Sequence, residues 1–202
     1  MSGIIAQNSG RHTGLVKASS GGGVWNLIET LTSDGSDATL DFTSGIDSTY
    51  DEYVFKIINM HPESDTQRFT FQGNAAGGSG YNETITSTAF KAYHFEDDSA
   101  TALTYDTGED QAQGTAFQPL SSTCGNDNDQ HYSGYLHLFN PSSDVFVKHF
   151  ISRGVVAHDE NLMIDDYFAG YFNTASPVDS IRFKMSADAI DAGDICLYGI
   201  ST

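Results

Sequence analysis

Hydrophobic and polar positions alternate along many short stretches of this chain, with the period of two that is typical of β-strands with one buried face. The clearest stretch is SIRFKMS, in which Ile181, Phe183 and Met185 face one way and the residues between them are polar. No stretch of twelve or more residues carries an apolar stripe at helical spacing. The pattern therefore predicts an all-β protein.

Ten such stretches are separated by sequences such as SDGSD, HPESD and NPSSD. The Gly, Asp, Asn and Ser residues in these connections suit the backbone conformations that turns require. The predicted strands are residues 24–32, 38–43, 52–61, 68–73, 84–96, 131–140, 144–157, 165–174, 179–187 and 194–200. This succession predicts an antiparallel two-sheet sandwich of jelly-roll type over residues 25–202.

Several predicted strands are apolar on both faces, which a simple sandwich does not need. GYLHLFN sets Tyr135, His137 and Phe139 against Leu136 and Leu138, and EYVFKIINM sets Tyr53, Phe55 and Ile57 against Val54, Ile58 and Met60. These strands are either central and covered on both sides, or one face packs against another subunit. We favour the second explanation, because the outer face of each sheet in a sandwich normally contacts water.

The segment 97–130 is polar, acidic and poor in core residues. It predicts a long loop with one strand around Leu103 to Tyr105. Loops of this length inside a compact domain are usually functional or bound to a partner.

Residues 1–24 show no sustained period, and SSGGG at 19–23 has the composition of a flexible linker. A fully extended segment of this length reaches at most ~80 Å. We therefore expect an extended N-terminal docking arm over residues 1–24. Its expected contacts are the apolar Ile4, Ile5, Leu15 and Val16, which would fill shallow pockets, and the cationic Arg11 and Lys17, which would pair with acidic groups or carbonyls.

Charge is divided unevenly along the chain. The 202 residues carry a formal net charge of −18, from 9 basic and 27 acidic residues. Residues 1–24 contain two cations and no acid, so the remainder, with 7 basic and 27 acidic residues, carries −20. A body this negative disfavours nucleic acid and anionic membranes as partners. The sequence also lacks an apolar run long enough to span a bilayer and an N-terminal hydrophobic signal core, so we expect a soluble protein made in a cytoplasm.

The usual catalytic signatures are missing. The chain has no intact GxSxG, HExxH, CxxC or P-loop sequence. Cys124 and Cys196 are expected to be free, largely buried thiols. NDNDQ at 126–130 offers oxygen ligands but lacks the Gly and the distal Glu of a complete calcium loop. We therefore expect no enzyme activity, no cofactor and no metal.

The histidines are expected to be structural. His94, His137 and His149 lie among aromatic and aliphatic residues, which predicts partly buried, hydrogen-bonded side chains. His158 is followed by Asp159 and is expected to be a solvated charge on a loop. Paired carboxylates could serve a glycosidase, but with 27 acids such pairs arise by chance.

The sequence resembles small virion proteins of tailed bacteriophages, including marine and cyanobacterial phages. The resemblance is carried by SGRHTGLVKASSGGG, LDFTSGIDSTYDEYVFKIINMHPESD, LFNPSSDVFVKHFISR and GYFNTASPVDSIRFKMSADAIDAGDICLYGI, which together cover most of the chain outside 97–130. It implies a structural role in the virion, and no active-site residues come with it.

Two locations follow from the resemblance. One is the capsid exterior, as a decoration or cement protein that forms a trimer, binds the major capsid protein and stabilises the shell. The other is the tail, as a fibre or adhesin component that binds a host-surface glycan or receptor, with the segment 97–130 as the recognition element. The short chain without fibre-like repeats favours the capsid. In either location the protein would be made in the host cytoplasm.

Overall fold

A computed structural model describes residues 24–201, which form two antiparallel β-sheets and contain no helix. The larger sheet consists of β1 (Val24–Thr32), β3 (Glu52–Pro62), β5 (Ile85–Phe95), β6 (Thr101–Tyr105), β7 (Ala112–Gly114), β9 (Tyr132–Phe139), β10 (Lys148–His158), β11 (Leu162–Phe172) and β13 (Ile190–Ser201). The smaller sheet consists of β2 (Leu40–Phe42), β4 (Phe69–Ala75), β8 (Gln118–Pro119) and β12 (Val178–Met185). Each of the ten predicted strands overlaps an observed strand, and the all-β prediction is confirmed.

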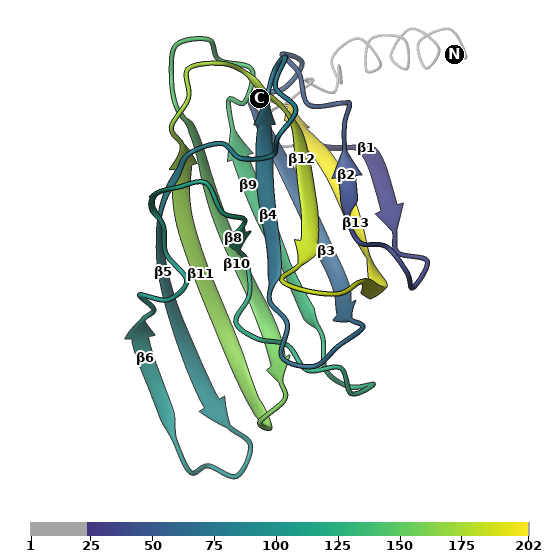
Figure 1. The fold of residues 1–202 in the computed structure, drawn as a ribbon, viewed down its shortest axis with the longest axis vertical. Coiled ribbons are helices and arrows are strands. Elements are labelled where there is room, and N and C mark those ends of the chain that lie inside the picture. The colour runs from purple at the N-terminus through teal and green to yellow at the C-terminus, as the bar shows by residue number, and fades with distance from the viewer. Residues whose placement is uncertain (1–23, 202) are drawn as a thin grey trace, which may run out of the picture.

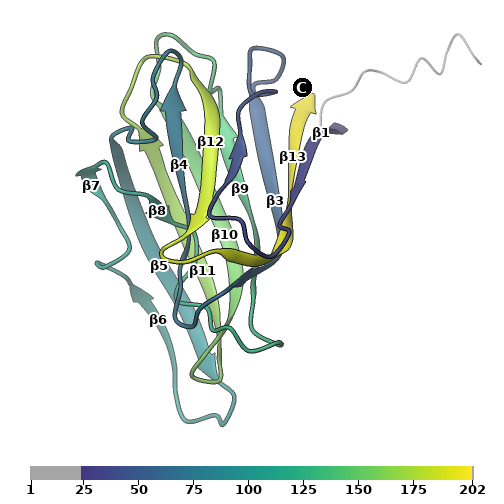
Figure 2. The same ribbon diagram turned by 45° about the vertical axis from the view of Figure 1, so that its right-hand side comes forward.

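The two sheets form two layers, with the smaller sheet on one side of the larger (Figures 1 and 2). The strand order is β1-β13-β3-β9-β10-β11-β5-β6 in the larger sheet, with β7 paired to β5, and β2-β12-β4-β8 in the smaller. β1 begins beside the end of β13, where Val24 pairs with Ser201. No helix of residues 24–201 is long and apolar enough to cross a membrane.

The core lies between the sheets and is dominated by phenylalanines. Phe183 of β12 is fully buried, and its ring centroid lies 5.2 Å from that of Phe55 on β3 and 5.7 Å from that of Phe69 on β4. Ile181 and Met185, its predicted neighbours on the same face, are also buried. Burial of these large apolar side chains is the main source of the domain's stability.

One predicted face is wrong, in β3. The alternation placed Met60 on the face opposite Ile57, yet both side chains are buried in the core. The register of β3 against β9 shifts between Ile57 and Met60, and Asn59 has a positive φ of 52°. Extra residues at this bulge reset the alternation, so that Met60 turns inward.

The start of β10 also differs from the prediction, because residues 144–147 form a loop and the strand begins at Lys148. The Ser143 hydroxyl accepts hydrogen bonds from the backbone N–H groups of Val145 (3.2 Å) and Phe146 (2.9 Å). This turn leaves Val145 and Phe146 pointing into solvent, with 66% and 67% of their surface exposed. Local side-chain-to-backbone bonding has replaced the strand here.

The segment 97–130 folds onto the sandwich. β6 confirms the strand predicted near Leu103, and β7 and β8 are two further short strands. Two ion pairs tie the segment to the sheets, between Glu109 and Arg68 (2.5 Å) and between Asp106 and Lys91 (2.8 Å). Two of its acids are therefore bound internally and are not free for a partner.

Asp166 of β11 lies beneath this segment and is 1% exposed. Its carboxylate accepts hydrogen bonds from the backbone N–H (2.6 Å) and the hydroxyl (2.8 Å) of Ser122. Burial raises the pKa of Asp166 to about 6, although the two bonds from Ser122 oppose the shift. The ionised side chain is therefore disfavoured in the folded protein.

This raised pKa predicts a stability that falls as pH rises. The folded-state pKa lies above the unfolded value, so the folded state binds the extra proton between about pH 4 and pH 6, and stability is lost through that window. Asp166→Asn keeps an acceptor and a donor for Ser122 and cannot ionise. The unfolding free energies of wild type and variant should diverge by about 3 kcal/mol between about pH 4 and about pH 7.5, in favour of the variant at the higher pH. If the free energies of unfolding from urea titrations change with pH in the same way in wild type and Asp166→Asn, the raised pKa of Asp166 is contradicted.

Candidate binding face

The outer face of the larger sheet is apolar over most of its width. Alternation along the strands directs nine of the protein's exposed large hydrophobic side chains to this face: Trp25, Leu27, Phe90, Leu103, Tyr105, Tyr135, Ile151, Val155 and Met163. The smaller sheet lies on the opposite side and does not cover them (Figure 2). We call this surface the binding face, because contiguous exposed apolar surface of this kind marks interaction sites.

The outer face of the smaller sheet has the opposite character. Arg182 of β12 binds Asp41 of β2 through two N–H···O contacts, and its guanidinium lies 4.1 Å from the ring centroid of Tyr81. Lys184 lies over the ring of Phe117. The polar groups here are paired within the chain, so the two outer faces differ and only the binding face resembles an interface.

An aromatic ridge crosses the centre of the binding face. Phe90 of β5 and Tyr167 of β11 are register partners whose rings stack with centroids 4.6 Å apart and planes 6° apart. Arg153 of β10 covers the other side of Tyr167, with its guanidinium carbon 4.8 Å from the ring centroid. Tyr135 of β9 follows as the register partner of Arg153. These four residues form the ridge, and Arg, Tyr and other aromatic residues are the types enriched at protein interfaces.

Asp165 holds the ridge in place. Its carboxylate accepts hydrogen bonds from Nε (3.0 Å) and a terminal nitrogen (2.8 Å) of Arg153, and a third from the Tyr167 hydroxyl (3.0 Å). The hydrogen bond from Arg153 lowers the pKa of Asp165 and raises that of the guanidinium. The ridge is therefore pre-organised, which reduces the entropy cost of binding.

A groove of about 490 Å³ lies beside the ridge on the same face. Its floor is formed by small side chains, among them Ala169 of β11 and Thr88 of β5, and Ile151 and Tyr171 flank it. Small residues at these positions lower the surface next to the tall Phe90–Tyr167 pair. The binding face therefore carries a projection and an adjacent depression.

The binding face is almost neutral in a very acidic protein. On β3, β9, β10, β11, β5 and residues 194–201 of β13, the outward charged residues are Lys56, Arg153, Glu52, Asp165 and Asp194, a formal net charge of −1. Two of these acids are paired within the face, Asp165 with Arg153 and Glu52 with Nδ1 of His137. Most of the 27 acids therefore lie elsewhere.

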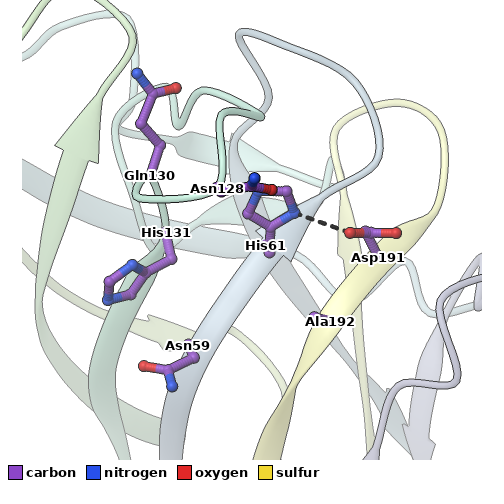
Figure 3. Close-up of a pocket in the computed structure, with 7 residues that line it drawn as sticks. All are labelled: Asn59, His61, Asn128, Gln130, His131, Asp191 and Ala192. Atoms are coloured by element: carbon purple, nitrogen blue, oxygen red, sulfur yellow. Dashed lines mark hydrogen bonds and ion pairs between the residues drawn. The ribbon is translucent and has the colours of Figure 1, made fainter.

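A polar pocket of about 350 Å³ is the other candidate site (Figure 3). Nδ1 of His61 lies 3.1 Å from a carboxylate oxygen of Asp191, and Nε2 lies 3.2 Å from the carbonyl oxygen of Asp127. Figure 3 shows the ring of His61 directed at Asp191, whereas His131 and Gln130 point away from it. Both ring nitrogens are occupied and none of the seven lining residues is a Ser, Cys or Lys nucleophile, so the contacts have a structural role.

The histidine predictions are only partly correct. His137 is half-buried and bonded to Glu52, as predicted, but His94 and His149 are exposed. His158 was predicted to be solvated, yet its side chain is only 14% exposed and lies between Asp159 (2.6 Å) and the Thr123 hydroxyl (2.7 Å). The segment that contains Thr123 packs on the end of β10, a long-range contact that no local pattern around His158 predicts.

The remaining candidates for chemistry are isolated. Cys124 and Cys196 are free thiols; Cys124 is buried, and burial raises the pKa of its thiol to about 12, whereas Cys196 is half-buried on β13. Within residues 24–201, no group of three or more His, Cys, Asp or Glu side chains could hold a metal ion. Of the predicted site residues, Ile4, Ile5, Arg11, Leu15, Val16 and Lys17 all lie outside the described residues.

Sequence reasoning found the apolar excess on these strands but not the ridge itself. Arg153 and Phe90 are far apart in sequence, and only the order of β10, β11 and β5 places both beside Tyr167. No protein-family model, curated protein or solved structure matches this chain.

Proposed function

We propose that this protein is a structural component of a tailed-phage virion, a decoration protein that docks on the capsid exterior and stabilises the shell. The observation that carries the proposal is the binding face, a pre-organised aromatic surface suited to contact between the protein subunits of a larger assembly. The resemblance to phage virion proteins is the reason for proposing a phage particle as the location. The major capsid protein is the proposed partner. The proposal includes a trimer, a jelly-roll type of sandwich and an N-terminal arm over residues 1–24.

The end of the sandwich where β1 begins suits a docking role. By register, Val24, Ser201 and Phe139 all lie at this end. The loop after Phe139 presents the exposed Val145 and Phe146 there. An arm leaving from this end would therefore bind beside an exposed apolar contact. Several weak contacts on one oligomer reinforce each other through effective concentration.

The alternative is a tail component that binds a host-surface glycan. Sugar rings stack on the free face of an aromatic side chain, but Tyr167 is covered by Phe90 on one side and by Arg153 on the other. The acids of segment 97–130 that pair with Arg68 and Lys91 are likewise engaged within the chain. These contacts withhold Tyr167 and two acids of the segment from a glycan, while Trp25 and Tyr105 stay exposed. The preference for the capsid therefore also rests on the short chain without fibre-like repeats.

Labelling of virions tests the location. A tag-specific antibody should decorate the capsid shell in electron micrographs, and quantitative mass spectrometry should give hundreds of copies per particle. Labelling confined to the tail, with a few or a few dozen copies, would support the alternative and overturn the capsid role.

The arm has a separate test. Deletion of residues 2–20 should leave a folded oligomer that no longer co-sediments with capsids, because the arm contributes several of the linked contacts. Circular dichroism and light scattering establish that the truncated protein is intact. Normal co-sedimentation of the truncated protein would exclude the arm from docking.

A further inference from the structure

We infer that the partner at the binding face is another copy of this chain, packed so that the ridge of each copy enters the groove of the other. This inference rests on the proposed function, since it assigns a contact between copies within the proposed oligomer. It leaves the end that carries Phe146 free for the particle.

The first argument is charge. Each copy carries −18, so two copies repel one another through most of their surfaces. The binding face has a formal net charge of only −1 over these positions, with Asp165 paired to Arg153 and Glu52 in contact with Nδ1 of His137. Of its acids only Asp194 lies outside these pairs, so two copies can approach through this face with little repulsion.

The second argument is shape. The ridge of Tyr135, Arg153, Tyr167 and Phe90 lies directly beside the groove floored by Ala169. A second copy therefore offers a ridge that fits the groove and a groove that accepts the ridge. A reciprocal contact of this kind, made by the same patch on both copies, is isologous and pairs the copies about a two-fold axis.

The third argument is area. Eight strands spaced about 4.8 Å apart and about 30 Å long present a face of roughly 1,000 Å². A stable protein interface takes about 800 Å² from each partner. The binding face is large enough for a specific contact, and its exposed Ile151 and Val155, at 50% and 45%, would lie at its centre.

The test is the mass of the full-length protein in solution. Light scattering coupled to size exclusion should give an oligomer for wild type, and added salt of about 0.5 M should preserve or strengthen it, because salt screens repulsion between acidic bodies and leaves apolar contacts intact. Ile151→Glu should weaken self-association by at least about 100-fold, because it places a carboxylate in an apolar interface. Its register neighbour His137 and the nearby Arg153 allow the folded monomer to accept the new charge.

Two valines provide a matched control. Val155→Glu lies on the binding face and should dissociate the oligomer, whereas Val145→Glu lies on the exposed loop and should not. Thermal unfolding shows whether each variant is folded, and Val155→Thr, which keeps the β-branched shape without charge, should retain the oligomer.

The outcomes separate this inference from the proposed function. A monomeric wild type, or an oligomer unchanged by folded Ile151→Glu and Val155→Glu, overturns the inference, even if the protein still binds capsids. An oligomer that is lost only in the face variants supports it, even if the protein is later found on the tail.

Discussion

Replacement of Gly154 with alanine is expected to destabilise the domain by about 3 kcal/mol, because it forces a fully buried tyrosine out of place. Gly154 of β10 pairs with Gly134 of β9, and the ring of Tyr132 lies over this bare stretch of backbone. A Cβ at Gly154 would lie 2.2 Å from a carbon of that ring. Tyr132 is buried against Phe69 and has no free space to enter.

Urea denaturation of Gly154→Ala and of Gly108→Ala measures this effect. Gly108 lies on an exposed turn, and a Cβ there would come no closer than 3.4 Å to a side-chain oxygen of Asp106, so the control should change stability by less than about 0.5 kcal/mol. In a double variant, Tyr132→Leu should recover part of the loss, since the clash and the ring are removed together. Equal stability of Gly154→Ala and wild type would show that the tyrosine can move.

Gly154 also connects the core to the binding face. Its neighbours Arg153 and Val155 point outward, so a displacement of β10 would shift the ridge at the same time. We therefore expect Gly154→Ala to weaken self-association as well as folding, whereas Ile151→Glu should affect self-association alone.

Replacement of Lys148 with methionine is expected to cost about 3 kcal/mol, because it removes three charge-assisted hydrogen bonds in the interior. The ammonium group of this fully buried side chain donates to the carbonyl oxygens of Phe146 (2.6 Å), Thr174 (3.2 Å) and Ala175 (3.2 Å). Methionine fills a similar volume but leaves all three carbonyls without this donor. The two loops that close this end of the sandwich would then lose their common anchor.

Chemical denaturation of Lys148→Met should be compared with Lys184→Met. Lys184 contributes a partly exposed contact with the ring of Phe117, at 5.0 Å, so its replacement should cost less than about 1 kcal/mol. A loss below about 1 kcal/mol for Lys148→Met would show that water replaces the buried donor. If the loop holding Phe146 is part of the docking end, Lys148→Met should also weaken co-sedimentation with capsids at temperatures where the domain remains folded.

Alternation along the chain was enough to locate the strands and most of their inward faces. Ile181, Phe183 and Met185 are buried as the pattern predicts. The prediction that Tyr135 and His137 lie on the face opposite the buried Leu136 and Leu138 is also correct. These features are local, because the pleat of a single strand sends successive side chains to opposite sides. The same reasoning identified strands with too much apolar surface for one core.

Local rules failed where one residue changed the geometry or where a distant segment supplied a partner. The bulge at Asn59 reversed the direction of Met60, and the turn at Ser143 turned a predicted strand end into an exposed loop. Lys148 is buried because Thr174 and Ala175 bring carbonyl groups to it from the far end of β11. Alternation puts Lys148 on the same side of β10 as the buried Phe150, but the carbonyls of Thr174 and Ala175 come from a segment far away in the sequence.

The binding face shows most clearly which features local sequence determines and which the tertiary structure determines. Local sequence was sufficient to show that its strands carry spare apolar side chains. Only the pairing of β9, β10, β11 and β5 decided that Tyr135, Arg153, Tyr167 and Phe90 form one continuous ridge beside a groove. The side to which a residue points is determined within its own strand, whereas its lateral neighbours are selected by long-range hydrogen bonding and by the packing of the whole core.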